Sequence, residues 1–238
     1  MLKRTKGRLL ITLLVVTGLA GTMNTTSVSQ QERKYAVTAL KDSKVELLSA
    51  TEGLTQRQLN YRSASTQFSV KHYLMQMAET EKKLWETIST AMKQPANPEK
   101  RADIKLTDEA LLKLAEEGSI GSLSANTFKQ ANTPIKTAEE AKTSFKTMRN
   151  DHIKYMKSST EDLRNHVVLT PAGWLDCYQF ILLISATTNH TIHLIDDLKA
   201  HPDRRASAAV RDAGFGKGRG TTGRILVEKG TLRIGEPF

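Results

Sequence analysis

The sequence predicts an all-α protein whose centre, residues 30–203, is an up-down four-helix bundle with one short extra helix. Three observations predict this class. Four long stretches carry apolar residues at three- and four-residue steps, the period of a helix with one buried face. Helix start and stop signals bound these stretches. The composition changes after Asp203, where glycine and arginine become frequent. We expect an N-terminal signal helix before the bundle and a short irregular or β-hairpin tail, 204–238, after it.

Residues 1–29 have the pattern of a secretory signal peptide. Four basic residues precede the apolar run LLITLLVVTGLAGTM. This run is shorter than the roughly 20 apolar residues that a membrane-spanning helix needs. Ser27 and Ser29 form a small-x-small cleavage site before Gln30. We therefore expect an exported protein, periplasmic or secreted, with no membrane span after cleavage. The alternative is an uncleaved N-terminal membrane anchor.

The first two long helices are expected from Ser29 to about Thr51 and from Ser69 onward. Ser29 is a favourable N-cap, and Gly53 is a favourable stop. The first apolar face comprises Val37, Leu40, Leu47 and Leu48. A polar connection, LTQRQLNYRSAST, follows, and Phe68 is placed to staple onto the first turn of the second helix. The second apolar face comprises Val70, Tyr73, Leu74, Met77, Leu84, Trp85, Ile88 and Met92.

A short helix and a third long helix are expected next. Residues 107–117 have acidic residues in the first turn, where the helix dipole favours them. A loop rich in serine, glycine and asparagine follows at 118–134. Thr137 and Glu140 then have the spacing of a capping box that opens a long helix. Its buried face comprises Ala141, Phe145, Met148, His152, Met156 and Leu163.

The last helix is expected to begin at Thr170 and Pro171 and to lie at the centre of the bundle. A hydroxyl N-cap followed by proline is a strong helix start. The periodic stripe comprises Trp174, Tyr178, Ile181, Ser185, Thr188, Ile192 and Ile195, and four leucines widen it: Leu175, Leu182, Leu183 and Leu194. Cys177 is the single cysteine, so we expect a small buried hydrophobic residue and no intramolecular disulfide.

The net charge of +10 belongs mainly to the two ends of the chain. Residues 1–24 hold four basic and no acidic residues, and residues 201–238 hold eight basic and four acidic residues. The middle, 25–200, has 23 basic and 21 acidic residues. A nearly balanced middle argues against nucleic acid as the partner of the bundle.

Two stretches resemble the DinB-like (damage-inducible B) superfamily over about 30–203. They are LTQRQLNYRSASTQFSVKHYLMQMAETEKKLW and HTIHLIDDLKAHPD, which look like that family's second-helix and last-helix signatures. The resemblance implies a four-helix bundle. Many members bind a divalent metal through three histidines, and some are thiol transferases or metal-dependent hydrolases.

Carrying the family's three histidines over by position places them on Gln76, Thr187 and Thr191. The first lies eight residues after the aromatic residue that opens the second helix, and the other two lie four apart on the last helix. Amide and hydroxyl oxygens bind zinc or nickel weakly, whereas imidazole, thiolate and carboxylate groups bind them well. The resemblance therefore implies a bundle without the usual metal site, so we expect no cofactor. A Zn or Ni ion is the cofactor of the alternative below.

A displaced metal site is that alternative. Four residues are its candidate ligands: His72, Gln76, His190 and His193. The competing interpretation is that these histidines pack at polar edges or in the core, because two histidines on one helix need a third ligand and a supporting shell. His152, on the third long helix, is another candidate and has the same weakness. The acidic residues that could supply acid–base chemistry are interpreted as solvated faces: Glu79, Glu81, Asp196 and Asp197.

The tail, 204–238, resembles part of the β-barrel domain of bacterial translation initiation factor two, particularly in GKGRG and GTLRIGEPF. Strand-like runs occur at Arg224–Glu228 and Thr231–Ile234, with Lys229-Gly230 as a hairpin turn between them. The tail carries no GTPase motif. We interpret it as a fusion or truncated fragment.

Three functions remain open on the sequence. The first is an exported, non-enzymatic bundle that binds an unknown small molecule or none, as a monomer or a homodimer. The second is a metal-dependent hydrolase or thiol transferase that uses the displaced histidines. The third is a translation-related protein that contacts RNA through its basic tail.

The signal pattern generates a first prediction. Residues 1–29 should be missing from the mature protein, because the basic region and the apolar run are well formed. N-terminal sequencing or intact-mass analysis of protein from the producing organism measures this. Recovery of the full-length chain from the cytosol, with Met1 or Leu2 at its end, would contradict it.

Overall fold

A computed structural model describes residues 28–62, 68–120, 134–200, 207–216 and 220–229. The predicted signal peptide, apart from Val28 and Ser29, lies outside these ranges, as do most of the predicted loop 118–134 and the strand expected at Thr231–Ile234. Within the described ranges, no helix is both long and apolar enough to cross a membrane.

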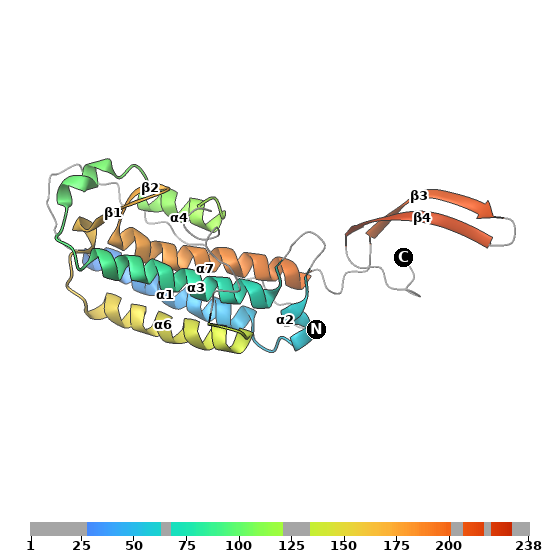
Figure 1. Ribbon diagram of the computed structural model, residues 1–238, viewed down its shortest axis with the longest axis horizontal. Helices are drawn as coiled ribbons and strands as arrows, with labels where there is room; N and C mark the ends of the chain where they lie inside the picture. Colours follow the sequence, from blue (N-terminus) through green and yellow to red (C-terminus); the bar gives the residue numbers. More distant parts are fainter. Residues whose placement is uncertain (1–27, 63–67, 121–133, 201–206, 217–219, 230–238) are drawn as a thin grey trace.

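Four long helices form a bundle, as the sequence predicts (Figure 1). They are α1 (Gln30–Ala50), α3 (Val70–Ala91), α6 (Ala138–Ser158) and α7 (Cys177–Ala200). The shorter helical elements are α2 (Gln56–Asn60), η1 (Pro98–Asp103), α4 (Asp108–Glu116) and η3 (Leu163–Asn165). The predicted extra helix is α4. The helix α2, which begins at a Thr55–Gln58 capping box, lies in the stretch expected to be a polar connection.

Local capping signals set the starts of four helices. Ser29 and Glu32 form a complete capping box at α1. Ser69, Thr107 and Thr137 accept hydrogen bonds from backbone N–H groups in the first turns of α3, α4 and α6. The predicted staple also forms, with the rings of Phe68 and Tyr73 5.7 Å apart between centroids. These helix starts confirm the sequence-based expectation. The capping box expected at α6 is half formed, because the Glu140 carboxylate accepts from the backbone N–H of Lys136 at 2.7 Å.

The start of α7 differs from the prediction, and the bundle region is not purely helical. Thr170 and Pro171 lie at the turn of a hairpin between β1 (Val167–Thr170) and β2 (Gly173–Asp176). Proline suits the second position of such a turn as well as it suits a helix start. Gly173 has a φ of +105°. The helix begins only after Asp176, whose carboxylate accepts a hydrogen bond from the backbone N–H of Gln179 at 2.8 Å.

The helix order is not the up-down order that the sequence led us to expect. Helix α1 packs against α6 and α7, and α3 packs against the same two helices. The starts of α1 and α7 are joined by Tyr178, whose hydroxyl donates to the Glu32 carbonyl, and their ends by Lys199, which donates to the Ala50 carbonyl. Helices α1 and α7 are therefore parallel.

Helices α3 and α6 are also parallel, because the residues of their first turns share one apolar cluster and Trp85 contacts Tyr155 nearer their ends. The start of α1 lies at the end of α6, where Arg33 donates to the Met156 carbonyl at 2.7 Å. The two pairs of helices thus run in opposite directions. The long connection between α3 and α6, which contains η1 and α4, makes this arrangement possible.

A buried arginine on α6 links all four long helices. Arg149 is fully buried and forms a bidentate ion pair with Glu81 of α3, with both N···O distances at 2.9 Å. Its remaining N–H groups donate to α1 and α7, and the acceptors are Leu40 O, Ser43 Oγ, Ile184 O and Thr188 Oγ1. His152 also contacts Glu81, at 2.9 Å. Both carboxylate oxygens of Glu81 and all three nitrogens of the Arg149 guanidinium have partners, which is the condition for burying charge.

The tail forms a second hairpin, β3 (Ser207–Gly216) with β4 (Gly220–Lys229), drawn beyond the end of α7 in Figure 1. Arg224–Glu228 is strand, as predicted. Among the described residues its partner is β3, which precedes it in the chain. Lys229 pairs with Ser207, whereas Gly230 and Thr231–Ile234 lie outside the described residues, so the hairpin expected there stays a prediction.

The core network generates a second prediction. Glu81→Gln should lower the free energy of unfolding by about 3–5 kcal/mol, because it leaves the Arg149 charge buried without its counter-ion. Glu86→Gln is the control, since the Lys82–Glu86 pair is 52% and 61% exposed and should change stability by less than about 0.5 kcal/mol. Denaturant titration measures both.

The pH dependence adds a check on the same variant. Burial alone would raise the pKa of Glu81, but Arg149 and His152 together lower it below its ordinary value of 4.5. A lowered folded pKa gives stability that is present above pH 4.5 and is lost as the pH falls further. The difference in free energy of unfolding between the unaltered protein and Glu81→Gln should therefore become smaller below pH 4.5. A difference that becomes larger there would contradict this account.

Candidate functional site

A cavity of about 230 Å³ lies between α3, α7 and the end of α4. We call it the Gln76 cavity. The described residues that line it are Phe68, Tyr73, Gln76, Met77, Thr80, Ala115, Gly118, Thr187, His190, Thr191 and Leu194. Because α3 and α7 are antiparallel, the first half of α3 faces the last half of α7. The cavity forms where these two half-helices meet the C-terminal end of α4.

The structure brings Gln76, Thr187 and Thr191 together around this cavity. These are the positions to which the family's histidines carry over. Thr187 and Thr191 lie one turn apart on α7, and Gln76 lies opposite them on α3. Within the described part of the chain, the Gln76 amide makes no hydrogen bond, so it remains available to a ligand.

Both threonine hydroxyls already donate a hydrogen bond to the backbone of α7. Thr187 Oγ1 donates to the Leu183 carbonyl at 2.8 Å, and Thr191 Oγ1 donates to the Thr187 carbonyl at 2.9 Å. Such bonds to the preceding turn are common for threonine in a helix. What the hydroxyls still offer is therefore their lone pairs, which are hydrogen-bond acceptors.

His190 is held in one tautomer by the end of α4. Its Nδ1 lies 2.9 Å from the carbonyl oxygen of Glu116. A carbonyl can only accept, so Nδ1 carries the proton and Nε2 of the neutral ring carries the lone pair. The last turn of α4 closes in a Schellman motif, with Ser119 N–H donating to Leu114 O and Gly118 N–H to Ala115 O. The carbonyl of Glu116 is left for His190.

Gly118 makes this arrangement possible in two ways. Its φ of +73° is a left-handed conformation that glycine adopts without strain. A Cβ at this position would also lie 2.6 Å from Cε1 and 2.7 Å from Nε2 of His190. The backbone of Gly118 therefore packs against the imidazole at a distance that only glycine allows.

The other candidate ligands lie elsewhere. His72 contacts Ser69 Oγ through Nδ1 at 2.7 Å and Arg62 through Nε2 at 3.1 Å. His193 is exposed, and His152 is buried against Glu81 and stacked on Trp85. Across the described ranges, no group of three or more His, Cys, Asp or Glu side chains could hold a metal ion.

The Gln76 cavity does not suit a transition metal. It offers one imidazole nitrogen, one amide and hydroxyl oxygens, whereas zinc and nickel prefer several imidazole, thiolate or carboxylate ligands. A threonine hydroxyl that donates to its own helix cannot serve as an anionic ligand. The cavity instead resembles a site for a small molecule, which combines apolar walls with a few polar groups.

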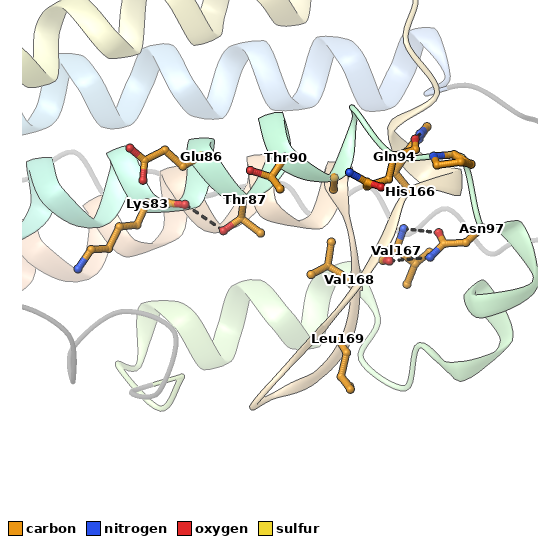
Figure 2. Close-up of a pocket in the computed structure, with 12 residues that line it drawn as sticks. Lys83, Glu86, Thr87, Thr90, Gln94, Asn97, His166, Val167, Val168 and Leu169 are labelled. Carbon is orange, nitrogen blue, oxygen red and sulfur yellow. Dashed lines mark hydrogen bonds between the residues drawn. The ribbon is translucent and has the colours of Figure 1, made fainter.

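A larger groove of about 740 Å³ runs between α3 and β1 (Figure 2). The Asn97 side chain bonds both the N–H and the carbonyl of Val167 there, at 2.8 and 2.9 Å. Both ring nitrogens of His166 lie near backbone carbonyls. Figure 2 shows Lys83 and Glu86 at the opposite end from His166, so the polar groups are spread along the groove. We therefore place the candidate site in the smaller cavity, where they converge.

Sequence reasoning missed three contributors to the site and its support. Arg149 gave no signal, because a lone arginine within an amphipathic pattern suggests an exposed residue. Glu116 and Gly118 meet His190 across 74 and 72 positions of sequence. Gly118 was available as a helix-stop signal, but nothing in the sequence indicates which side chain it contacts. Cys177 is buried as expected, and burial raises its pKa to about 12.

The fold resembles that of YfiT from Bacillus subtilis, which is described as a probable metal-dependent hydrolase with an unusual four-helix bundle topology. The TM-score is 0.51 at 14% identity, over 73% of this chain and 89% of that chain. At this identity the likeness shows the fold alone. The predicted four-helix bundle is thereby confirmed. No protein-family model matches the chain.

The sequence is also similar to stretches of translation initiation factor IF-2. It is 41% identical to the factor of Anoxybacillus flavithermus over 70 residues, and 51% identical to that of Listeria monocytogenes serovar 1/2a over 44 residues. These stretches cover 29% and 18% of this chain and 9% and 6% of the factors. The predicted resemblance to a piece of this factor is confirmed. The chain spans less than a tenth of the length of these curated relatives.

The contact between Gly118 and His190 generates a third prediction. Gly118→Ala should displace the imidazole from Glu116 and destabilise the fold by more than the roughly 1–2 kcal/mol that a left-handed alanine costs. Gly53→Ala is the matched control, because Gly53 has a φ of +68° and its added Cβ would meet nothing within 4 Å. Thermal unfolding and NMR of the His190 ring measure the two effects. Equal losses of stability with an unchanged His190 signal would contradict the prediction.

Proposed function

We propose that this protein is a non-enzymatic binding module that holds a small molecule in the Gln76 cavity without a transition metal. One observation carries the proposal. The positions that the family resemblance assigns to metal ligands, Gln76, Thr187 and Thr191, line one cavity and present neutral hydrogen-bonding groups. The cavity therefore lies where the resemblance implies a metal site, but its side chains are those of a small-molecule binding site.

The size and lining of the cavity support a small ligand. Its volume of about 230 Å³ equals the liquid volume of roughly seven or eight water molecules. Its lining includes apolar side chains from just before α3 and from α3, α4 and α7: Phe68, Met77, Ala115 and Leu194. Polar groups on the α7 side and at Gln76 would orient the ligand. This division between apolar walls and few polar groups is typical of small-molecule sites.

A metal-dependent hydrolase is the second candidate, and the likeness to YfiT favours it. That likeness concerns the fold, and one fold hosts many chemistries. The donor set of the cavity decides our preference for the binding module. A shifted site would need His72 and His190 to approach each other, whereas His72 is engaged by Arg62 and Ser69.

The two ends of the chain support further, independent proposals. The signal pattern of residues 1–29 supports export. The similarity to IF-2 favours a role in translation as another candidate. The matched stretch is 9% of the factor's length, so the activity of that whole factor is not carried over to this chain.

Metal analysis tests the proposed function and is our fourth prediction. Protein purified without chelator should contain far less than one zinc or nickel ion per chain. The triple variant Gln76→His, Thr187→His, Thr191→His should gain metal binding, because neutral imidazoles supply the lone pairs that amide and hydroxyl groups lack. Elemental analysis and metal titration measure both.

The control variant carries the same substitutions at exposed positions on separate helices: Gln56→His, Thr38→His and Thr143→His. It should gain no stoichiometric metal. About one metal ion per unaltered chain, lost on His190→Ala or His72→Ala, would overturn the proposal. That result would make the metal-dependent enzyme the better description.

A further inference from the structure

The polar side chains that α7 contributes to the Gln76 cavity offer hydrogen-bond acceptors to a ligand. Thr187 and Thr191 donate their hydroxyl protons to carbonyls of their own helix, so their lone pairs remain. His190 donates from Nδ1 to Glu116, so Nε2 of the neutral ring is an acceptor. The Gln76 amide can turn either its oxygen or its nitrogen to the cavity. The complementary ligand is therefore a molecule with several donors.

The electrostatic surroundings favour a positive ligand. The C-terminal end of α4, which carries the negative end of the helix dipole, lies at the cavity beside His190. The Glu116 carboxylate is held close by, where its Oε1 accepts from Asn189 Nδ2 at 3.0 Å. No lysine or arginine is among the described residues that line the cavity. An anion would have no counter-charge in the described lining.

The lining of the cavity also includes two aromatic rings. Phe68 and Tyr73 both line the cavity, with their ring centroids 5.7 Å apart. Aromatic faces attract ammonium groups, most strongly where water is excluded. Met77 and Leu194 supply apolar surface for a short hydrocarbon body.

We propose that the ligand of the Gln76 cavity is a small organic ammonium ion with a short apolar chain. This inference rests on the proposed function and names the chemical class of its ligand. The ammonium N–H groups donate to Thr187 Oγ1, Thr191 Oγ1 and His190 Nε2. The apolar chain packs against Met77 and Leu194.

A matched series of probes tests this as our fifth prediction. The full chain is titrated with n-butylammonium, 1-butanol and butyrate, which share a hydrocarbon chain and differ in charge. We expect n-butylammonium to bind at least about tenfold more tightly than 1-butanol, because hydrogen bonds to a charged group are the stronger ones. Butyrate should show no binding. Calorimetry and the NMR signal of the His190 ring report the binding and its location.

Three variants assign the binding to the named atoms. Thr187→Val with Thr191→Val removes two acceptors and keeps the side-chain shape, so n-butylammonium should bind about tenfold more weakly. Thr87→Val is the control, because Thr87 makes the same bond to its preceding turn, at 3.0 Å to the Lys83 carbonyl, outside the cavity. Gln76→Glu adds a carboxylate and should strengthen n-butylammonium binding by about tenfold.

The outcomes separate this inference from the proposed function. Equal or tighter binding of 1-butanol or butyrate at the cavity overturns the ammonium class and leaves the binding module standing. If none of the three probes binds and Gln76→Glu, folded by circular dichroism, binds no n-butylammonium, the inference is overturned. Stoichiometric metal in the same preparation would then overturn the proposed function as well. Loss of binding in Thr87→Val equal to that in the double variant also counts against the named atoms.

Discussion

The buried pair of Arg149 and Glu81 is the interaction on which the rest of the bundle depends. A guanidinium away from water must satisfy every N–H group, and here the acceptors come from α1, α3 and α7. Apolar stripes alone permit helices to slide or rotate, since many packings bury similar area. A bidentate pair permits only one register, because both oxygens must meet the fork of the guanidinium.

That register also places the cavity. Glu81 lies on α3 five positions after Gln76, and Thr188, which accepts from Arg149, follows Thr187 directly on α7. Fixing Glu81 and Thr188 on one arginine therefore sets Gln76 opposite Thr187. A second arginine, Arg164, fixes the position of α4, whose end borders the cavity. Arg164 pairs with carboxylates of α1 and α4 and with Asp176 before α7. Burial raises the pKa of Asp176, and Arg164 opposes that effect. This cluster anchors the start of α4, and the end of α4 reaches His190.

The hydrogen-bonding character of the cavity depends on the hydrogen bonds that its polar side chains already donate to the backbone. Threonine and histidine can donate or accept, and residue type alone leaves the polarity of the site open. The two threonine hydroxyls donate hydrogen bonds to carbonyls of α7, and His190 Nδ1–H donates one to a carbonyl of α4. The α7 wall of the cavity thereby offers acceptors near the negative end of α4. A four-helix bundle like that of YfiT is compatible with quite different sites for this reason.

Features that depend on neighbours a few residues apart could be predicted from the sequence. The caps at Ser29, Ser69, Thr107 and Thr137 and the four apolar stripes are of this kind, because their bonds close within one turn. Position counting from the family signature also led to the residues of the cavity. The Thr170-Pro171 pair could not be assigned locally, because it suits a helix start and a hairpin turn equally, and only the pairing of β1 with β2 decided between them. Tertiary structure alone decided the helix directions, the burial of Arg149 and the tautomer of His190. Each of these depends on a partner tens of positions away, and no local pattern encodes which distant carbonyl or carboxylate a side chain will meet.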